Sequence, residues 1–304
     1  MSDDFTKQMV TQARRTLEFE EWRAMISERM MLKRGQKWCA VIDSASDPDL
    51  PALLWAFQED ADIWPLFMNT MMHEISLKGP IFVAFQPGEK IADWLLTRAE
   101  TSPVGVLYAV AEGKENDLFE QLQNLLETPL PDGGTGLFRF FDPRVLHALT
   151  CFPDKRWTSL AVGPAEFLHA WEPGRAEALE LCEGTPEILR ECPSEPMPQE
   201  LLDFMARRNA PYAVLHEASN LKQASQFTDM PFSKAFSFVE PVCRSLDDLG
   251  ICGIRDMIAG VLCCLDAGAN VFAIPSVAQW MKAADKERSF PELLAAMPDE
   301  LTRK

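Results

Sequence analysis

The sequence predicts an α/β protein: an N-terminal helix, then a mixed sheet flanked by helices, then a small all-helical C-terminal lobe. Three observations predict this class. From about residue 38 to residue 171, short apolar runs alternate with amphipathic segments, as in a sheet covered by helices. Strand signals nearly vanish beyond residue 198. Three prolines between residues 192 and 198 indicate a linker between these two parts.

The 304 residues are enough for two modest domains. We therefore expect four segments: an N-terminal amphipathic helix at 1–37, an α/β domain at 38–190, a Pro-rich linker at 191–198 and a helical lobe at 199–304.

The first of these segments has the pattern of a long helix over residues 3–33. Apolar residues recur at every fourth position from Phe5 to Leu17, and Trp22, Ile26 and Met30 continue the stripe on a shifted face. Such a stripe usually packs against its own domain. A helix that binds a partner protein is the alternative.

The α/β domain should contain six strands and four helices. Each predicted strand is a short apolar run, and each predicted helix repeats apolar residues at a spacing of three or four. Because the two types alternate, we expect a mostly parallel or mixed sheet. The strands are expected at 38–42, 64–68 (an edge strand, because it contains proline), 81–85, 104–110, 137–141 and 166–170, and the helices at 51–57, 91–95, 118–126 (with Asn116 as its cap) and 143–152.

The C-terminal lobe should consist of helices alone. Its apolar residues follow a helical spacing, and Gly, Pro or Asn separates the segments. The helices are expected at 201–208, 236–246, 254–265, 277–284 and 291–297.

The most informative segment is the predicted strand at 137–141, which is apolar apart from Arg139. Burial of a charge is costly unless the charge is paired. We therefore expect Arg139 to form an ion pair, with Asp43 as the candidate partner. The residues that follow, Asp142 and Pro143, are typical of a helix start, because Asp can cap free N–H groups and Pro has no N–H to leave unpaired.

The Gly-rich stretch before this strand, residues 132–136, is interpreted as a tight turn. A phosphate-binding loop runs from a strand into a helix and usually carries a lysine, whereas this stretch runs into a strand and has none. The sequence therefore gives no reason to expect a nucleotide or another cofactor here.

Charge and cysteine usage exclude several classes of function. The net charge of −17 argues against binding to nucleic acid, whose phosphates require a basic surface. Residues 1–40 contain eight of the 29 Lys and Arg but six of the 46 Asp and Glu, so the acidic excess lies in the rest of the chain. That excess would suit a basic partner or would simply favour solubility. The eight cysteines lack the spacing of a metal site, and we expect them to be reduced and mostly buried.

One alternative function is a metal-dependent α/β enzyme. Asp43 and Asp47 follow a predicted buried strand, a position at which such enzymes often place metal-binding carboxylates. No second carboxylate cluster accompanies them. The competing interpretation pairs Asp43 with Arg139 and uses Asp47 or Asp49 to cap the next helix.

Aromatic and Met residues suggest a different kind of function, the binding of another protein. The chain has 19 Phe and 14 Met but only two Tyr. Such side chains mostly fill cores, but they also form adaptable binding grooves. In the C-terminal lobe, Met230, Phe232, Phe236 and Phe238 lie in and just after a predicted loop, and we expect them to contact a partner.

Residues 137–146, with the sequence LFRFFDPRVL, resemble the signature of the type VI secretion effector adaptor/chaperone family, the Tap or TEC proteins. Residues 40–48, 79–85 and 163–168 resemble further strands of that family in the same order. The resemblance covers roughly residues 38–171. A looser likeness extends to residues 249–251, Asp256 and Pro275. Phe141 stands where the family often has Tyr, which would remove one hydroxyl hydrogen bond.

The resemblance implies a cytoplasmic adaptor without enzymatic activity. Members of the family bind a toxic effector, usually near its N-terminal region, and help to load it onto the VgrG spike. It also implies that Arg139, Asp142 and Arg144 occupy motif positions, and we expect them to hold the corner between strand and helix. No cofactor, metal or nucleic-acid contact is expected. Membrane insertion is not expected either, since no apolar run is long enough to cross a bilayer and no signal peptide is present. A structural component of the secretion apparatus is a further alternative.

Overall fold

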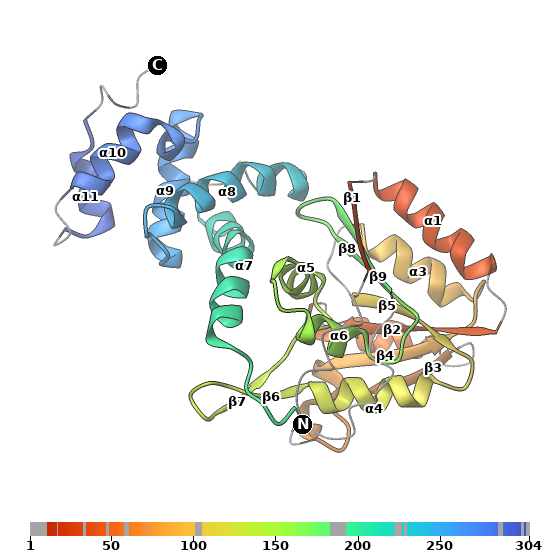
Figure 1. Ribbon diagram of the computed structural model, residues 1–304. Helices are drawn as coiled ribbons and strands as arrows, with labels where there is room; N and C mark the ends of the chain where they lie inside the picture. Colours follow the sequence, from red (N-terminus) through yellow and green to blue (C-terminus); the bar gives the residue numbers. More distant parts are fainter. Residues whose placement is uncertain are drawn as a thin grey trace. The chain divides into compact units, whose positions relative to one another are not determined.

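The computed structural model describes residues 11–16, 18–32, 35–46, 49–57, 61–70, 72–100, 105–182, 193–221, 227, 230–284, 288–298 and 301 (Figure 1). The chain divides into two compact units, with unit 1 ending at Met205 and unit 2 beginning at Ala206. This division falls within one helix, α7 (Gln199–Ser219), and not in the Pro-rich segment at 191–198. The first residues of α7 therefore belong to the α/β unit.

Unit 1 contains a seven-stranded sheet in which every neighbouring pair of strands is antiparallel. The expectation of a mostly parallel or mixed sheet is therefore wrong in its strand directions, although the α/β class is confirmed. The strands, in sheet order, are β1 (Thr11–Thr16), β9 (Glu177–Cys182), β8 (Phe167–Glu172), β5 (Gly105–Ala111), β2 (Gln36–Asp43), β4 (Pro80–Phe85) and β3 (Ala61–Pro65).

The physical reason for this difference is the position of β2. Both β4 and β5 pair with β2 in antiparallel register, so β4 and β5 run parallel to each other on its two sides. The helix α3 (Lys90–Arg98) joins them, as in a parallel crossover. The alternation of strands and helices thus correctly indicates a crossover from β4 to β5. The strand β2 lies between these two strands, so neither of them has a parallel neighbour.

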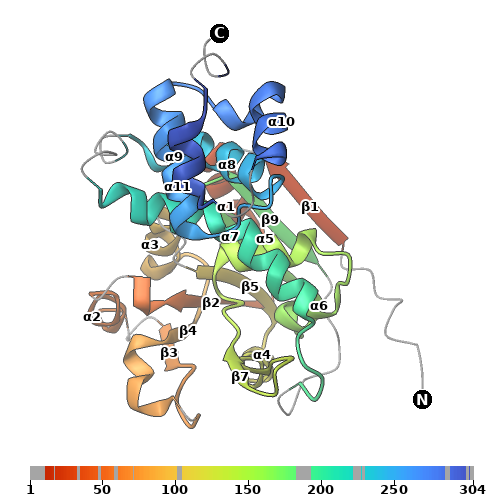
Figure 2. The same ribbon diagram turned by 90° about the vertical axis from the view of Figure 1, so that its left-hand side faces the viewer.

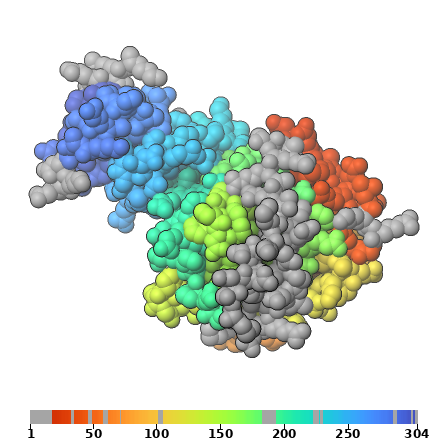
Figure 3. All heavy atoms as spheres, viewed as in Figure 1, coloured from red at the N-terminus to blue at the C-terminus, as the bar shows by residue number. Residues whose placement is uncertain are grey.

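Helices cover both faces of this sheet (Figure 1). Along β2, Trp38, Ala40 and Ile42 pack into one core, and Cys39 and Val41 pack into the other. Because both faces are buried, the central strands are continuous apolar runs. The first core is covered by α1 (Phe19–Leu32), α2 (Leu50–Trp55) and α3, and the second by α4 (Glu115–Leu125), α5 (Pro143–Cys151) and α6 (Arg156–Val162). Figure 3 shows α1 in red and α4 in yellow as separate parts of the surface of unit 1.

The N-terminal segment differs from the single helix expected over residues 3–33. Residues 11–16 form β1, an edge strand paired with β9, and the helix begins at Phe19. Pairing with β9 provides hydrogen-bond partners for one edge of residues 11–16 and overrides their weak helical spacing. Phe5 and Met9 lie outside the described residues. Trp22, Ile26 and Met30 are buried against the sheet, so this stripe packs on its own domain as predicted.

The Gly-rich stretch forms the predicted turn, but the strand predicted at 137–141 is wrong, because the strand that follows the turn ends at Leu137. A two-stranded hairpin, β6 (Glu127–Pro129) and β7 (Thr135–Leu137), surrounds the turn, in which Gly133 has a φ of 85°. Residues 138–142 are irregular. Their aromatic side chains, Phe138, Phe140 and Phe141, are buried in the core under α4, α5 and α6. Core packing, and not strand pairing, accounts for the apolar run.

Unit 2 is helical throughout its described residues, as predicted. It comprises the rest of α7, α8 (Phe232–Asp247), α9 (Ile254–Ala267), α10 (Pro275–Ala283) and α11 (Phe290–Ala296), with the short turn η5 (Val271–Ala273) (Figure 2). Val239, Val242, Val261 and Val277 are fully buried in its core. None of the helices in the described part of the chain combines the length and apolar character needed to cross a bilayer.

His169 on β8 should make the stability of unit 1 depend on pH. Burial lowers its pKa to about 3; Glu180 opposes this shift, and Arg29 adds to it. The ring stacks on Trp38 and Phe167. Because the unfolded chain binds a proton below pH ~6.5 and the folded chain binds it only near pH 3, stability should fall as the pH is lowered through this window.

Between pH 7 and pH 5 the loss due to His169 should amount to about 2 kcal/mol. Urea titrations of the wild type and of His169→Leu at both pH values measure it. Carboxylates contribute equally to both proteins, so their effect cancels in the difference. An equal pH dependence of the two proteins would contradict the prediction.

Candidate functional site

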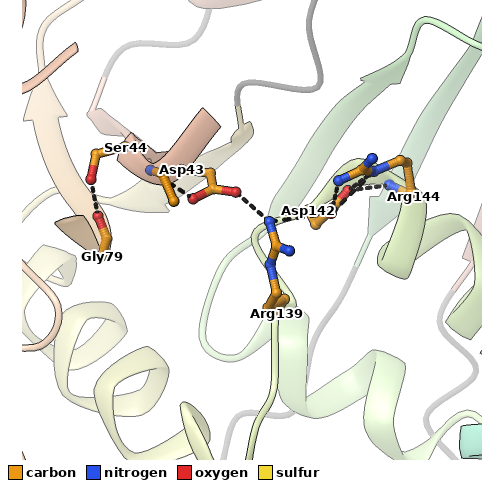
Figure 4. A network of polar contacts seen from close by, with 7 residues as sticks. Asp43, Ser44, Gly79, Arg139, Asp142 and Arg144 are labelled. Atoms are coloured by element: carbon orange, nitrogen blue, oxygen red, sulfur yellow. Dashed lines mark hydrogen bonds and ion pairs between the residues drawn. The ribbon is translucent and has the colours of Figure 1, made fainter. Parts of the chain in front are cut away.

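The predicted ion pair between Asp43 and Arg139 is present (Figure 4). Asp43 is the last residue of β2, and its side chain is almost fully buried. Its Oδ2 accepts a hydrogen bond from Nη2 of Arg139 at 2.5 Å, and its Oδ1 accepts one from the backbone N–H of Ala45 at 3.1 Å. The pair therefore joins the end of a central strand to a segment 96 residues further along the chain.

Asp142 caps α5, as predicted. Its side chain accepts a hydrogen bond from the backbone N–H of Arg144, and Pro143 occupies the first turn of the helix. The Nε and Nη2 atoms of Arg144 also donate to the carboxylate of Asp142, at 2.8 and 2.6 Å. Arg139 lies 3.7 Å from the same carboxylate. Asp142 is buried, so both guanidinium groups offset the cost of burying its charge.

Arg139 itself is less buried than the sequence suggests. It lies in the irregular segment after β7, and 43% of its side chain is exposed. Its guanidinium lies 5.9 Å from the ring centre of Phe141, within range of a cation–π interaction. Phe141 is buried and contacts Phe140 edge to face. The aromatic side chains anchor this segment in the core while Arg139 reaches across it to Asp43.

Ser44 connects this corner to a third segment. Its Oγ lies 2.6 Å from the carbonyl oxygen of Gly79 and 3.0 Å from that of Leu77. Leu77 belongs to the short helix η3 (His73–Lys78), and Gly79 precedes β4. We name Asp43, Ser44, Arg139, Asp142 and Arg144 the corner network. It holds together the ends of β2, η3 and α5.

The chemistry of the corner network is that of charge compensation. Two carboxylates and two guanidinium groups alternate, and both oxygens of Asp43 accept hydrogen bonds. The metal-enzyme alternative also requires Asp47, which lies outside the described residues. Asp49 stands at the start of α2, but its side chain makes no capping hydrogen bond. Similarly, Asn116 lies inside α4 and does not cap it.

The four residues expected to contact a partner do not form one exposed surface. Phe236 is buried in the core of unit 2, where its ring centre lies 4.4 Å from that of Tyr212. Met230 and Phe238 are partly buried against the same core. Phe232, at the start of α8, is 42% exposed. The prediction is therefore wrong for Phe236, because α8 begins four residues before it and turns it inward.

Exposed apolar side chains are concentrated elsewhere. Ten large apolar side chains are exposed among the described residues, and five of them lie between residues 53 and 77. We name these five the apolar cluster; they are Leu53, Trp55, Met68, Ile75 and Leu77. They belong to α2, η3 and the segment after β3. This stretch of the sequence therefore carries half of the exposed large apolar side chains among the described residues, and exposed apolar groups are a feature of protein-binding surfaces.

Sequence reasoning also missed a buried polar cluster that includes a residue of α5, the helix that Asp142 caps. His147 of α5 lies 3.3 Å from Glu172 at the end of β8 and 3.4 Å from Glu177 at the start of β9. The spacing of these residues in the sequence matches no metal-binding or catalytic motif, so no local signal could have indicated them.

Comparison with protein families identifies one match. Residues 38–159 match a family model described as "Domain of unknown function (DUF4123)". The matched region contains the corner network and the apolar cluster. No curated protein and no solved structure matches the chain.

Proposed function

We propose that this protein is a cytoplasmic adaptor that binds a type VI secretion effector and helps to load it onto a VgrG spike. The observation that supports the proposal most is the family match over residues 38–159, because this domain is known in type VI effector adaptors. The same region carries the motif positions Arg139, Asp142 and Arg144, which resemble those of the Tap or TEC proteins.

The corner network would serve such an adaptor as a scaffold. Its charged groups bond to one another, which leaves the neighbouring surface to make the contacts with the effector. The apolar cluster is the surface that we assign to the effector. Its side chains belong to short helices and a connecting segment, and Ser44 holds the end of one of these helices, η3, by its bonds to Leu77 and Gly79. Apolar anchors on a rigid support are what a protein interface requires.

The test compares two doubly substituted proteins. Ile75→Glu with Leu77→Glu places two charges in the apolar cluster. Met31→Glu with Leu32→Glu places two charges at the end of α1, where both side chains are also exposed and lie outside the family match. Each protein is produced in a bacterium with an active type VI apparatus, in place of the wild type. The effector encoded beside the spike gene is then measured in the medium and in complexes with the adaptor.

We expect the first protein to lose about tenfold or more of the captured effector and of its secretion, and the second to retain both. Circular dichroism should show that both proteins fold. If a strain without the adaptor secretes every effector normally, the proposed function is wrong. If the second protein fails and the first does not, the function stands but the binding surface is misplaced.

A further inference from the structure

The buried cluster around His147 has features that a structural ion-pair network does not explain. His147 is fully buried, and neither of its ring nitrogens makes a hydrogen bond to the described residues. A protonated imidazole would need an acceptor at both nitrogens, and a buried donor without one is costly. Nδ1 nevertheless lies close to two carboxylates, 3.3 Å from Oε2 of Glu172 and 3.4 Å from Oε2 of Glu177.

The two carboxylates are themselves an unusual pair. Glu172 and Glu177 lie directly opposite each other in the ladder of β8 and β9, as its last pair before the turn at 173–176. Like charges in this position destabilise a sheet. Glu172 is fully buried, and Arg175 in the turn makes an ion pair with its Oε1. A buried carboxylate directly opposite a second one is an arrangement that a bound cation would stabilise.

We propose that His147, Glu172 and Glu177 form a binding site for a divalent transition-metal ion, with Zn²⁺ as the best-suited ion. One imidazole nitrogen and two carboxylate oxygens are ligands that zinc prefers. The three ligand atoms lie within 4.8 Å of one another. For zinc bonds of about 2.0–2.1 Å, a tetrahedral site places neighbouring ligand atoms about 3.3–3.4 Å apart.

The two distances from Nδ1 match this spacing. In a tetrahedral site the metal ion lies along the lone pair of the imidazole nitrogen, and the other ligands lie to the sides of that direction. Carboxylate oxygens placed to the sides are poorly aligned for a hydrogen bond with the nitrogen. This explains why His147 makes no hydrogen bond to either carboxylate despite the short distances.

The surroundings also suit an ion. Arg175 holds Oε1 of Glu172, which leaves Oε2 directed at His147; such an outer contact orients a ligating carboxylate. Glu177 is 31% exposed, so its side of the site provides access for the ion and for a water ligand. A bound ion would fasten the turn between β8 and β9 to the middle of α5, the helix whose N-terminus Asp142 caps.

The experiment uses the full chain, freed of metal with a chelator and titrated with Zn²⁺ in a calorimeter. We expect one zinc ion per chain and a higher melting temperature in its presence. Glu177→Gln, which changes a partly exposed residue, should weaken the affinity by at least about tenfold, and Arg175→Met by a similar factor. The control is His73→Gln, because His73 is exposed and outside the cluster; it should bind zinc as the wild type does.

Co²⁺ provides a second readout that does not depend on the variants. A tetrahedral site of nitrogen and oxygen ligands should give the intense visible absorption of four-coordinate Co²⁺ without a thiolate charge-transfer band. The proposal is overturned if the wild type binds no zinc, if Glu177→Gln binds it as tightly as His73→Gln does, or if a thiolate band shows that cysteines hold the metal.

Discussion

Asp142→Ala is expected to lower the free energy of unfolding by about 3 kcal/mol. The change removes the cap of α5, which contributes about 1 kcal/mol, and the charged hydrogen bonds to Arg144, which contribute about 2 kcal/mol more. It also leaves Arg139 with one carboxylate partner in place of two. Urea denaturation followed by circular dichroism measures the loss.

Two variants show whether the loss has this cause. Asp132→Ala removes a similar local bond, from Asp132 to the N–H of Gly134, in an exposed turn, and should cost less than about 0.5 kcal/mol. Arg139→Met should cost about 1–2 kcal/mol, because Arg139 is partly exposed but its ion pair is with a buried carboxylate, that of Asp43. A loss below 1 kcal/mol for Asp142→Ala would mean that the corner network does not hold the fold together.

The corner network is the part of the site that could be predicted from the sequence. An arginine within an apolar run requires an acidic partner if it is buried. Asp43, directly after the first predicted strand, was the candidate for that partner. The helix start at Asp142 and Pro143 follows from local rules alone. These predictions succeed because each depends on the cost of leaving one polar group without a partner.

Pairing between distant strands could not be predicted in the same way. β1 is polar apart from Ala13, and Glu177 and Glu180 interrupt the apolar residues of β9, so neither strand is a continuous apolar run. Together they form the edge of the sheet beside β8. The position of β1 depends on that of β9, because β9 is its neighbour in the sheet. The cluster of His147, Glu172 and Glu177 is created by the pairing of β8 with β9 and by the packing of α5 on β8, so it has no signal in the sequence.

The direction of a side chain on a helix likewise depends on where the helix starts. Phe236 was expected in or just after a loop and is buried, because α8 begins at Phe232. By contrast, the faces of the central strands were predictable, since β2, β4 and β5 are apolar on both sides and must lie between two layers.

Gly105→Ala is expected to be the most damaging single substitution near the site. Gly105 begins β5 and pairs with Ile42, the residue before Asp43. A Cβ atom at this position would lie 2.2 Å from the carbonyl oxygen of Val41 and 3.1 Å from Cα of Ile42. Both are backbone atoms of the central strand β2, which cannot move without disturbing its pairing with β4.

The loss should reach about 3 kcal/mol or more, at the upper end of the cost of overpacking, because no flexible side chain can move aside. Gly136→Ala is the matched control: its Cβ would approach Leu130 at 3.0 Å, but the contact is with the end of a side chain at a hairpin. Urea denaturation compares the two, and amide hydrogen exchange locates the damage. Faster exchange should begin at the end of β2 that carries Asp43, because this is where the added methyl group separates β2 from β5. If the two alanine variants are equally stable, the close approach of β5 to β2 does not limit stability. In that case it is also not what holds the end of β2 in place, where Asp43 bonds to Arg139.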